Sequence, residues 1–176
     1  MIDLGEPLHA ADTGFVRAAP AEVFALLADP YGHPAFWVGM RTLDHKVTHG
    51  PGGEVDTAVG DRWRMRALFG MGGIDVEAEV SDLRSGAGGH HIWMDWRGHR
   101  DPLLGFPLRQ RVFEAETEWW VRPWPDAGAP ARGSLVTFFW RVRSVPQRPQ
   151  QRLLEQLRRL GWRGIHGVKA ETETPR

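Results

Sequence analysis

Hydrophobic and polar residues alternate with a period of two along most of the middle of the chain. This alternation is typical of β-strands that have one buried face and one face in water. Segments rich in Gly and Pro separate the alternating runs, as expected for turns. We expect six strands in this region, at about residues 41–49, 61–69, 74–83, 90–98, 109–122 and 134–144.

The strands at 61–69 and 74–83 fit one antiparallel hairpin on both faces. Apolar residues alternate with arginines in the first strand and with acids in the second. A register that pairs apolar with apolar residues and opposite charges with each other is therefore expected. It places these residues opposite each other: Met65 and Ala78, Phe69 and Ile74, Arg64 and Glu79, Arg66 and Glu77.

The last two strands behave in the same way. Their expected register places these residues opposite each other: Trp119 and Phe138, Thr117 and Trp140, Glu116 and Arg141, Glu114 and Arg143. Two hairpins that satisfy both faces at once indicate an antiparallel sheet with one wet face and one buried face.

Helices are expected on either side of this region. Residues 8–18 predict a first strand, and Pro20 then stands where a first helical residue would, ahead of an apolar run that ends at Asp29-Pro30. Residues 33–39 predict a second short helix. The segment after Pro149 predicts a long helix, with an apolar stripe of Leu153, Leu157, Leu160 and Val168. It is the only predicted element large enough to cover the buried face of the sheet.

Composition narrows the function. The chain of 176 residues, expected to form one domain over 1–176, carries 22 basic and 22 acidic residues, so its formal net charge is zero. This balance argues against a nucleic-acid-binding surface. The absence of cysteine excludes disulfides and thiolate chemistry. No signal peptide or bilayer-spanning segment is seen, so we expect a cytoplasmic protein without integral membrane association.

The order of elements and one local motif resemble a known superfamily. The order is strand, two short helices, six strands and long helix, and residues 17–30 with 33–37 are similar to an "APxEVFxxLxDxxxxPxW" opening. Both resemble the START-like, or SRPBCC, superfamily, in its bacterial polyketide cyclase/dehydrase-like branch. The resemblance implies an α+β helix-grip fold: a curved seven-stranded antiparallel sheet, two short helices and a long C-terminal helix around a cavity for a hydrophobic molecule. The Pro-rich turn at 123–130 and the Gly-rich last helix depart from the pattern.

Inward parity on each strand, together with the cavity that the resemblance implies, gives a candidate binding set. The chain has nine Trp and eight Phe, which can fill a core or line a pocket. The candidate ligand-binding residues are Trp37, Trp63, Met65, Phe69, Met94, Trp96, Phe113, Thr117, Trp119, Phe138, Trp140, Trp162 and His166.

Few polar residues share the inward parity. His45 is a candidate general base, and Arg109 and Arg111 lie beside loops that edge the pocket mouth in the family. An arginine there could hold a carboxylate, phosphate or enolate oxygen through paired donors. Core hydrogen bonding for the histidine and a solvated strand end for the arginines remain open alternatives.

The glycines of the last helix leave two interpretations open. Gly161, Gly164 and Gly167 recur every three residues, and each costs about 1 kcal/mol relative to Ala inside a helix. They form either a smooth strip that leaves room for a ligand, or a point near Gly161 where the helix ends or kinks. Trp162 and His166 flank this strip.

The sequence carries no metal-binding spacing and no phosphate loop, so no metal and no cofactor are expected. Three functions remain open. The first is a cyclase, aromatase or dehydrase that acts on a polyketide-like intermediate, and the second is a non-catalytic carrier or sensor of a lipid or hydrophobic metabolite. The third is an interaction module with a collapsed cavity. A hydrophobic small molecule is the expected partner, and a homodimer is left open.

Overall fold

The computed structural model describes residues 7–29, 40–46, 48–49, 55–69, 72–100, 110–124, 133–144 and 150–173. Its centre is a seven-stranded antiparallel sheet with the order β1-β9-β8-β7-β6-β5-β2. The strands are β1 (Leu8–Val16), β2 (Met40–Lys46), β5 (Arg62–Phe69), β6 (Gly72–Gly86), β7 (Gly89–Arg100), β8 (Gln110–Trp124) and β9 (Gly133–Ser144). A separate two-stranded sheet pairs β3 (Thr48–His49) with β4 (Val55–Asp56).

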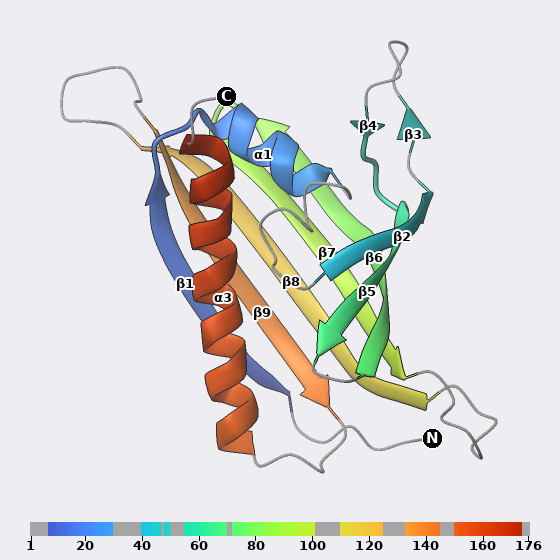
Figure 1. Ribbon diagram of the computed structural model, residues 1–176. Helices are drawn as coiled ribbons and strands as arrows, with labels where there is room; N and C mark the ends of the chain where they lie inside the picture. The colour runs from blue at the N-terminus through green and yellow to red at the C-terminus, as the bar shows by residue number, and fades with distance from the viewer. Residues whose placement is uncertain are drawn as a thin grey trace.

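Two helices of the described chain lie on one side of the large sheet. Helix α3 (Gln150–Glu173) runs along β1 and β9, and the shorter α1 (Pro20–Ala28) packs against β7, β8 and β9 (Figure 1). The predicted α+β architecture with a mostly antiparallel sheet is therefore confirmed. The predicted short helix at 33–39 lies outside the described residues. No helix within the described part of the chain is long and apolar enough to cross a membrane.

Helix α1 begins at a proline and has a hydrogen-bonded cap at its N-terminus. Pro20 is its first residue, and the backbone N–H of Ala19 donates to Oε2 of Glu22 over 3.1 Å. That contact satisfies a backbone donor that no intrahelical bond can reach. The buried Val23 and Leu27 of this helix face the sheet.

The two faces of the sheet follow the predicted alternation. The predicted register of β8 and β9 is confirmed, with Trp119 opposite Phe138 and Glu116 opposite Arg141. The predicted register of β5 and β6 is wrong by two residues, because Met65 lies opposite Val76 and Arg64 opposite Glu77. A shift of two residues keeps every side chain on its predicted face, so the faces are correct although the partners differ.

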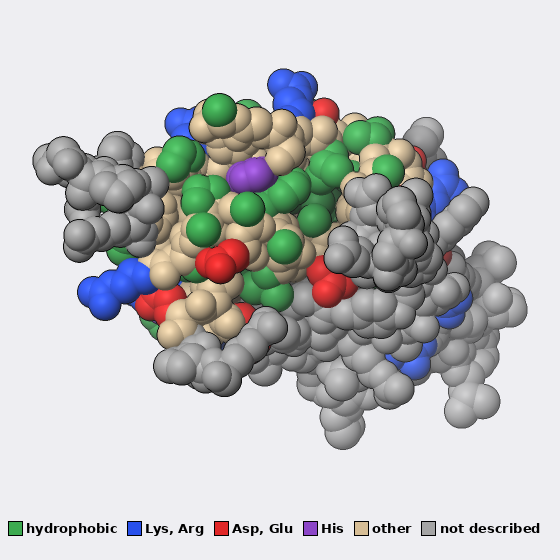
Figure 2. Space-filling model, turned by 90° about the horizontal axis from the view of Figure 1, so that it is seen from above, with side chains coloured by type: hydrophobic (Ala, Val, Ile, Leu, Met, Phe, Trp, Pro, Cys, Tyr) green, Lys and Arg blue, Asp and Glu red, His purple; other side chains and the backbone are tan. Residues whose placement is uncertain are grey.

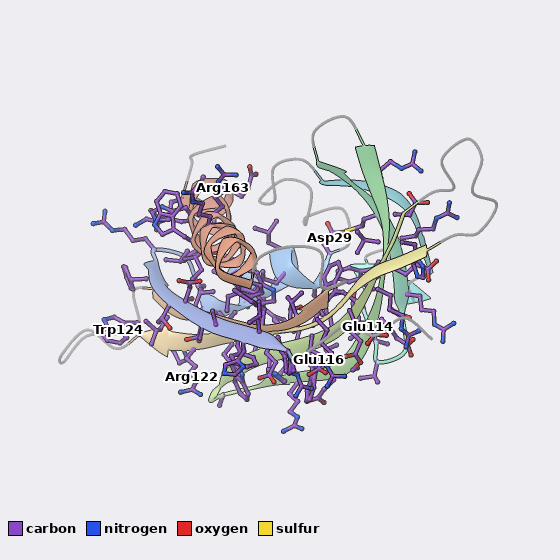
Figure 3. The ribbon with its side chains drawn as sticks, turned by 90° about the horizontal axis from the view of Figure 1, so that it is seen from below. Asp29, Glu114, Glu116, Arg122, Trp124 and Arg163 are labelled. Atoms are coloured by element: carbon purple, nitrogen blue, oxygen red, sulfur yellow. The ribbon has the colours of Figure 1, made fainter. Side chains whose placement is uncertain are left out.

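Charged residues form rows across the outer face. One row runs across five strands through Arg64, Glu77, Arg97, Glu114 and Arg143, with opposite charges at every step. Figure 3 shows Glu114 and Glu116 on the side of the sheet away from α3. Such cross-strand pairs of opposite charge favour this register.

Glu116 and Asp75 each bind an arginine on the outer face. The carboxylate of Glu116 accepts hydrogen bonds from the guanidinium of Arg141, and this bond, with the negative charge, raises the pKa of Arg141. Asp75 is buried, and its Oδ1 lies 2.8 Å from both Nε and Nη2 of Arg66. Charge-assisted contacts of this kind fix side-chain geometry as well as adding energy.

The regular pairing is interrupted at three places. Leu43 in β2, Ser81 in β6 and Val112 in β8 are each an extra residue that has no partner on the neighbouring strand. Each such bulge bends and twists its strand. All three lie in the half of the sheet from β8 to β2, whereas the pairings of β1 with β9 and of β9 with β8 are unbroken.

Helix α3 approaches the sheet most closely at two glycines. A methyl group at Gly14 of β1 would lie 2.5 Å from Cγ2 of Ile165. A methyl group at Gly161 of α3 would overlap Oδ2 of Asp12 and lie 3.4 Å from Cδ1 of Phe138. The helix also continues past all three glycines to Glu173, so it does not end near Gly161. Gly161 therefore permits close packing of α3 on the sheet, rather than leaving space for a ligand at that residue.

The first prediction concerns this close approach. Gly161→Ala raises helix propensity by about 1 kcal/mol but forces the new methyl group into Asp12. We expect a net destabilisation of about 1–3 kcal/mol, as for other overpacked sites, measured by urea denaturation followed by circular dichroism. Gly88→Ala is the control, because a methyl group there meets no atom within 4 Å. A stabilised Gly161→Ala variant would contradict this account of the contact between α3 and β1.

The second prediction concerns Asp75. Asp75→Asn removes the charge that Arg66 binds while keeping the shape of the side chain, so we expect a loss of about 1.5–3 kcal/mol in the free energy of unfolding. Glu77→Gln is the control, because its carboxylate is 44 % exposed against 5 % for Asp75. Equal losses for the two variants would show that burial of Asp75 does not matter.

Candidate functional site

The inward face of the large sheet, which α1 and α3 cover, is the candidate site. Eight of the predicted ligand-binding residues lie on this face, and all eight are buried. They are Trp63, Met65, Met94, Trp96, Thr117, Trp119, Phe138 and Trp140. Four strands, β5, β7, β8 and β9, contribute to this set, so the sheet gathers residues from positions 63 to 140 into one wall.

Aromatic rings and one hydroxyl organise the middle of this wall. The rings of Trp119 and Phe138 are stacked, with centroids 4.2 Å apart and planes 30° apart. Nε1 of Trp96 donates a hydrogen bond of 2.7 Å to Oγ1 of Thr117. The wall is therefore apolar, with one buried polar group held in place by a neighbouring indole.

Several predicted residues fall outside what the structure describes. Trp37 and Arg109 lie outside the described residues, and so do the side chains of Phe69, Phe113 and His45. The backbone of His45 pairs with Trp63, whose side chain is inward. This pairing agrees with the predicted inward face, but the side chain of His45 is not described, so its inward position stays a prediction.

The parity argument for Arg111 fails. The bulge at Val112 shifts the register, so that Arg111 pairs with His99 rather than continuing the inward series of Phe113. His99 belongs to the outer face, where its Nε2 lies 3.9 Å from Oε2 of Glu77. Because a bulge reverses the face of the residues beyond it, the strand position of Arg111 no longer supports a place in the interior. Its side chain itself is not among the described ones.

The placement of Trp162 and His166 beside the ligand is also wrong. Trp162 is 59 % exposed, His166 is exposed as well, and their rings pack on each other with centroids 4.1 Å apart. The buried face of α3 instead carries Gly161, Ile165 and Val168. Each helical step turns 100°, so residue 162 points away from a stripe of this spacing. Figure 3 shows the adjacent Arg163 on the side of α3 away from the sheet.

The structure adds two ionisable residues that the sequence analysis did not identify. Asp12 shares the inward row of Phe138, with one carboxylate oxygen buried beneath Gly161 of α3. His90 shares the inward row of Val121. The alternation in residues 8–18 was too weak to indicate its inward face, but the pairing of β1 with β9 now defines it.

Asp12 and His90 do not form a catalytic pair. Three strand spacings separate β1 from β7, and the two residues are also in different rows, so they lie more than about 14 Å apart at the usual strand spacing. His90 instead accepts or donates a 2.6 Å hydrogen bond with Oγ of Ser85 and stacks on Phe24 of α1, with ring centroids 4.8 Å apart. From the end of the molecule that α1 covers, hydrophobic side chains gather around one histidine (Figure 2).

The outer face has its own cluster around His91. This buried imidazole stacks on Trp120 at 4.0 Å, and its Nδ1 lies 3.3 Å from Oδ2 of Asp82. Nε2 of His91 lies 3.7 Å from Oε2 of Glu118. Within the described ranges, no group of three or more His, Cys, Asp or Glu residues is placed to hold a metal ion.

A shallow depression of about 300 Å³ also lies on the outer face. Its charged lining consists of Asp95, Arg97, Glu114, Glu116, Arg141 and Arg143. These groups belong to the cross-strand rows, where opposite charges face each other. The depression is therefore a less suitable ligand site than the apolar inward face.

Comparisons with known proteins identify the fold. An uncharacterised protein from Rhizobium leguminosarum superposes with a TM-score of 0.66 at 14 % identity, covering 96 % of this chain and 95 % of that chain. A START superfamily protein from Mycobacterium smegmatis gives a TM-score of 0.66 at 10 % identity, with coverage of 94 % and 97 %. Ara h 8.0201 gives 0.61 at 11 % identity, with coverage of 97 % and 100 %.

No protein-family model and no curated protein sequence matches the chain. These three structural neighbours are each below 25 % identity, so they show the fold and nothing finer. The chain has a START/SRPBCC-like fold, as the order of its elements predicted.

Proposed function

We propose that the chain binds a hydrophobic small molecule between the inward face of its sheet and α3. The observation that carries this proposal is the gathering of four tryptophans, Trp63, Trp96, Trp119 and Trp140, on one buried wall. Binding sites for small molecules are lined mostly by apolar and aromatic side chains, with a few polar groups that orient the ligand. Thr117 is such a polar group in the middle of the wall.

The whole chain contributes to this proposed domain. The large sheet combines β1 and β2 with β5 to β9, and α3 packs on β1, which is far from it in the sequence. We therefore propose that residues 1–176 form a single ligand-binding domain, in keeping with the coverage of the structural neighbours.

The charges on the inward wall favour binding over acid–base chemistry. Asp12 and His90 are too far apart to act on one proton, and none of the inward side chains that the structure describes is Lys or Arg. A carrier or sensor needs only the apolar wall. We propose this role, binding without chemistry, as the primary function.

One observation favours a second candidate, a cyclase or dehydrase that acts on a hydrophobic polyketide-like intermediate. Asp12 places a carboxylate on the inward face beside Phe138, where it could exchange a proton with a bound substrate. The wall would then contribute mainly by holding the substrate in its reactive conformation.

The third prediction tests binding through two neighbouring tryptophans on opposite faces. Trp119 is fully buried on the inward wall, whereas Trp120 lies on the outer face against His91. We expect the purified wild-type chain to carry a hydrophobic compound in native mass spectrometry. Trp119→Leu should weaken that binding about tenfold, because it removes an aromatic contact, whereas Trp120→Leu should leave it unchanged.

Circular dichroism serves as the check that both variants are folded. Equal occupancy in the two folded variants would remove Trp119 from the binding wall. A wild-type chain that carries no compound, and takes up none of a panel of neutral polycyclic aromatics, would contradict the proposed function.

The fourth prediction separates the carrier from the enzyme. If the co-purified compound is a substrate, Asp12→Asn should abolish product formation, followed by liquid chromatography and mass spectrometry, and leave the bound fraction unchanged. That pattern is expected when a group acts only in the transition state. A wild-type chain that binds the compound without converting it supports the carrier.

A further inference from the structure

Thr117 and Trp140 form a polar spot in the apolar wall. They are directly opposite each other on β8 and β9, and their side chains are 4 % and 2 % exposed. Directly opposite residues of an antiparallel pair have Cβ atoms about 5 Å apart, so both side chains meet the same region of the interior. Met94 flanks Thr117 on β7, and Ala10 flanks Trp140 on β1.

Both residues can donate a hydrogen bond into that region of the interior. The Thr117 hydroxyl accepts from Nε1 of Trp96 and, within the described part of the chain, makes no other hydrogen bond, so its own proton is available. Nε1 of Trp140 is buried, and no acceptor among the described residues lies within hydrogen-bonding distance of it. An indole nitrogen can only donate, and a hydroxyl that already accepts one bond still has a proton to donate.

A buried donor without an acceptor destabilises the folded state, because folding removes its hydrogen bonds to water and supplies none in their place. The neighbouring inward residues Met94, Ala10 and Val80 supply no side-chain oxygen. The nearest described inward carboxylate in the register, Asp12, lies under α3 in the next row, outside hydrogen-bonding distance of Trp140. A ligand with an acceptor atom would satisfy both donors.

We infer that the ligand is an uncharged, mostly apolar compound that carries a carbonyl or ether oxygen, and that this oxygen binds at Thr117 and Trp140. The inference rests on the proposed function and specifies the ligand class for that same site. The two donors require a hydrogen-bond acceptor atom in the ligand. The surrounding Trp119, Phe138 and Met94 require the rest of the ligand to be apolar. An anionic group is disfavoured, because no described inward side chain is cationic and a buried unpaired charge is costly.

The experiment uses two probes that differ by one oxygen, fluorene and its ketone 9-fluorenone. Isothermal titration calorimetry gives the dissociation constant of each probe for the wild-type chain and for Trp140→Phe. The phenylalanine keeps an aromatic ring but removes the donor. We expect the ratio of the fluorene to the fluorenone dissociation constant to fall about fivefold in this variant, as for the loss of one neutral hydrogen bond.

Trp93→Phe is the matched control. Trp93 also has a buried Nε1 without a described partner, but it belongs to the outer face, opposite Asp82 and Glu118. Its replacement should leave the probe ratio unchanged. Thr117→Val should also lower the ratio, which provides a second variant if Trp140→Phe does not fold by circular dichroism.

The outcomes separate the two proposals. If the wild-type chain binds both probes and the ratio is the same in wild type, Trp140→Phe and Thr117→Val, the inference about the ligand class is overturned and the proposed function stands. An equal fall in Trp140→Phe and Trp93→Phe also overturns the inference. If the wild-type chain binds neither probe, the inference about the ligand class is overturned, and the native mass spectrum of the purified chain decides the proposed function.

Discussion

Every feature of this chain depends on keeping the antiparallel strands in a register that separates tryptophans from charges. A slip of one residue would move the arginines and glutamates of β5, β6, β8 and β9 into the interior and expose the tryptophan wall. The cross-strand rows of charge on the outer face oppose that slip, because they would be broken at the same moment. The inward wall can therefore carry many large aromatic rings, while the charges on the outer face keep the strand register specified.

The contact between α3 and β1 closes one side of this arrangement. Gly14 and Gly161 let the helix and the strand pack so closely that a methyl group at either position would clash with the opposite element. The same approach brings the Asp12 carboxylate under the helix, so the packing and the one inward acid of the described strands are linked. A change that loosens the helix would alter both the closure of the interior and the environment of that carboxylate.

The sequence predicted the faces of the sheet better than its details. The β8–β9 register was specified because aromatic pairs and charge pairs agree on a single alignment, whereas in β5–β6 two alignments satisfy both faces equally. Val112 could not be recognised as a bulge from its residue type, so the parity argument for Arg111 did not anticipate the shift in register. Trp162 was misplaced because it flanks the glycine strip of the last helix, although the spacing of Gly161, Ile165 and Val168 defines the buried stripe. Asp12 was missed because β1 has small residues on both faces.

The uneven distribution of bulges divides the sheet into a stiff half and a pliable half. The β1–β9–β8 pairings are regular, and α3 is packed on them, so this half has little freedom to change shape. The pairings from β8 to β2 carry the extra residues Leu43, Ser81 and Val112, and this part of the sheet curves away from that plane (Figure 3). A single inserted or deleted residue at a bulge changes curvature while leaving the pairs on either side intact. We therefore expect relatives that accommodate larger or smaller molecules to differ from this chain by insertions and deletions at the bulges of β2, β6 and β8, while β1, β9 and α3 evolve by substitution alone.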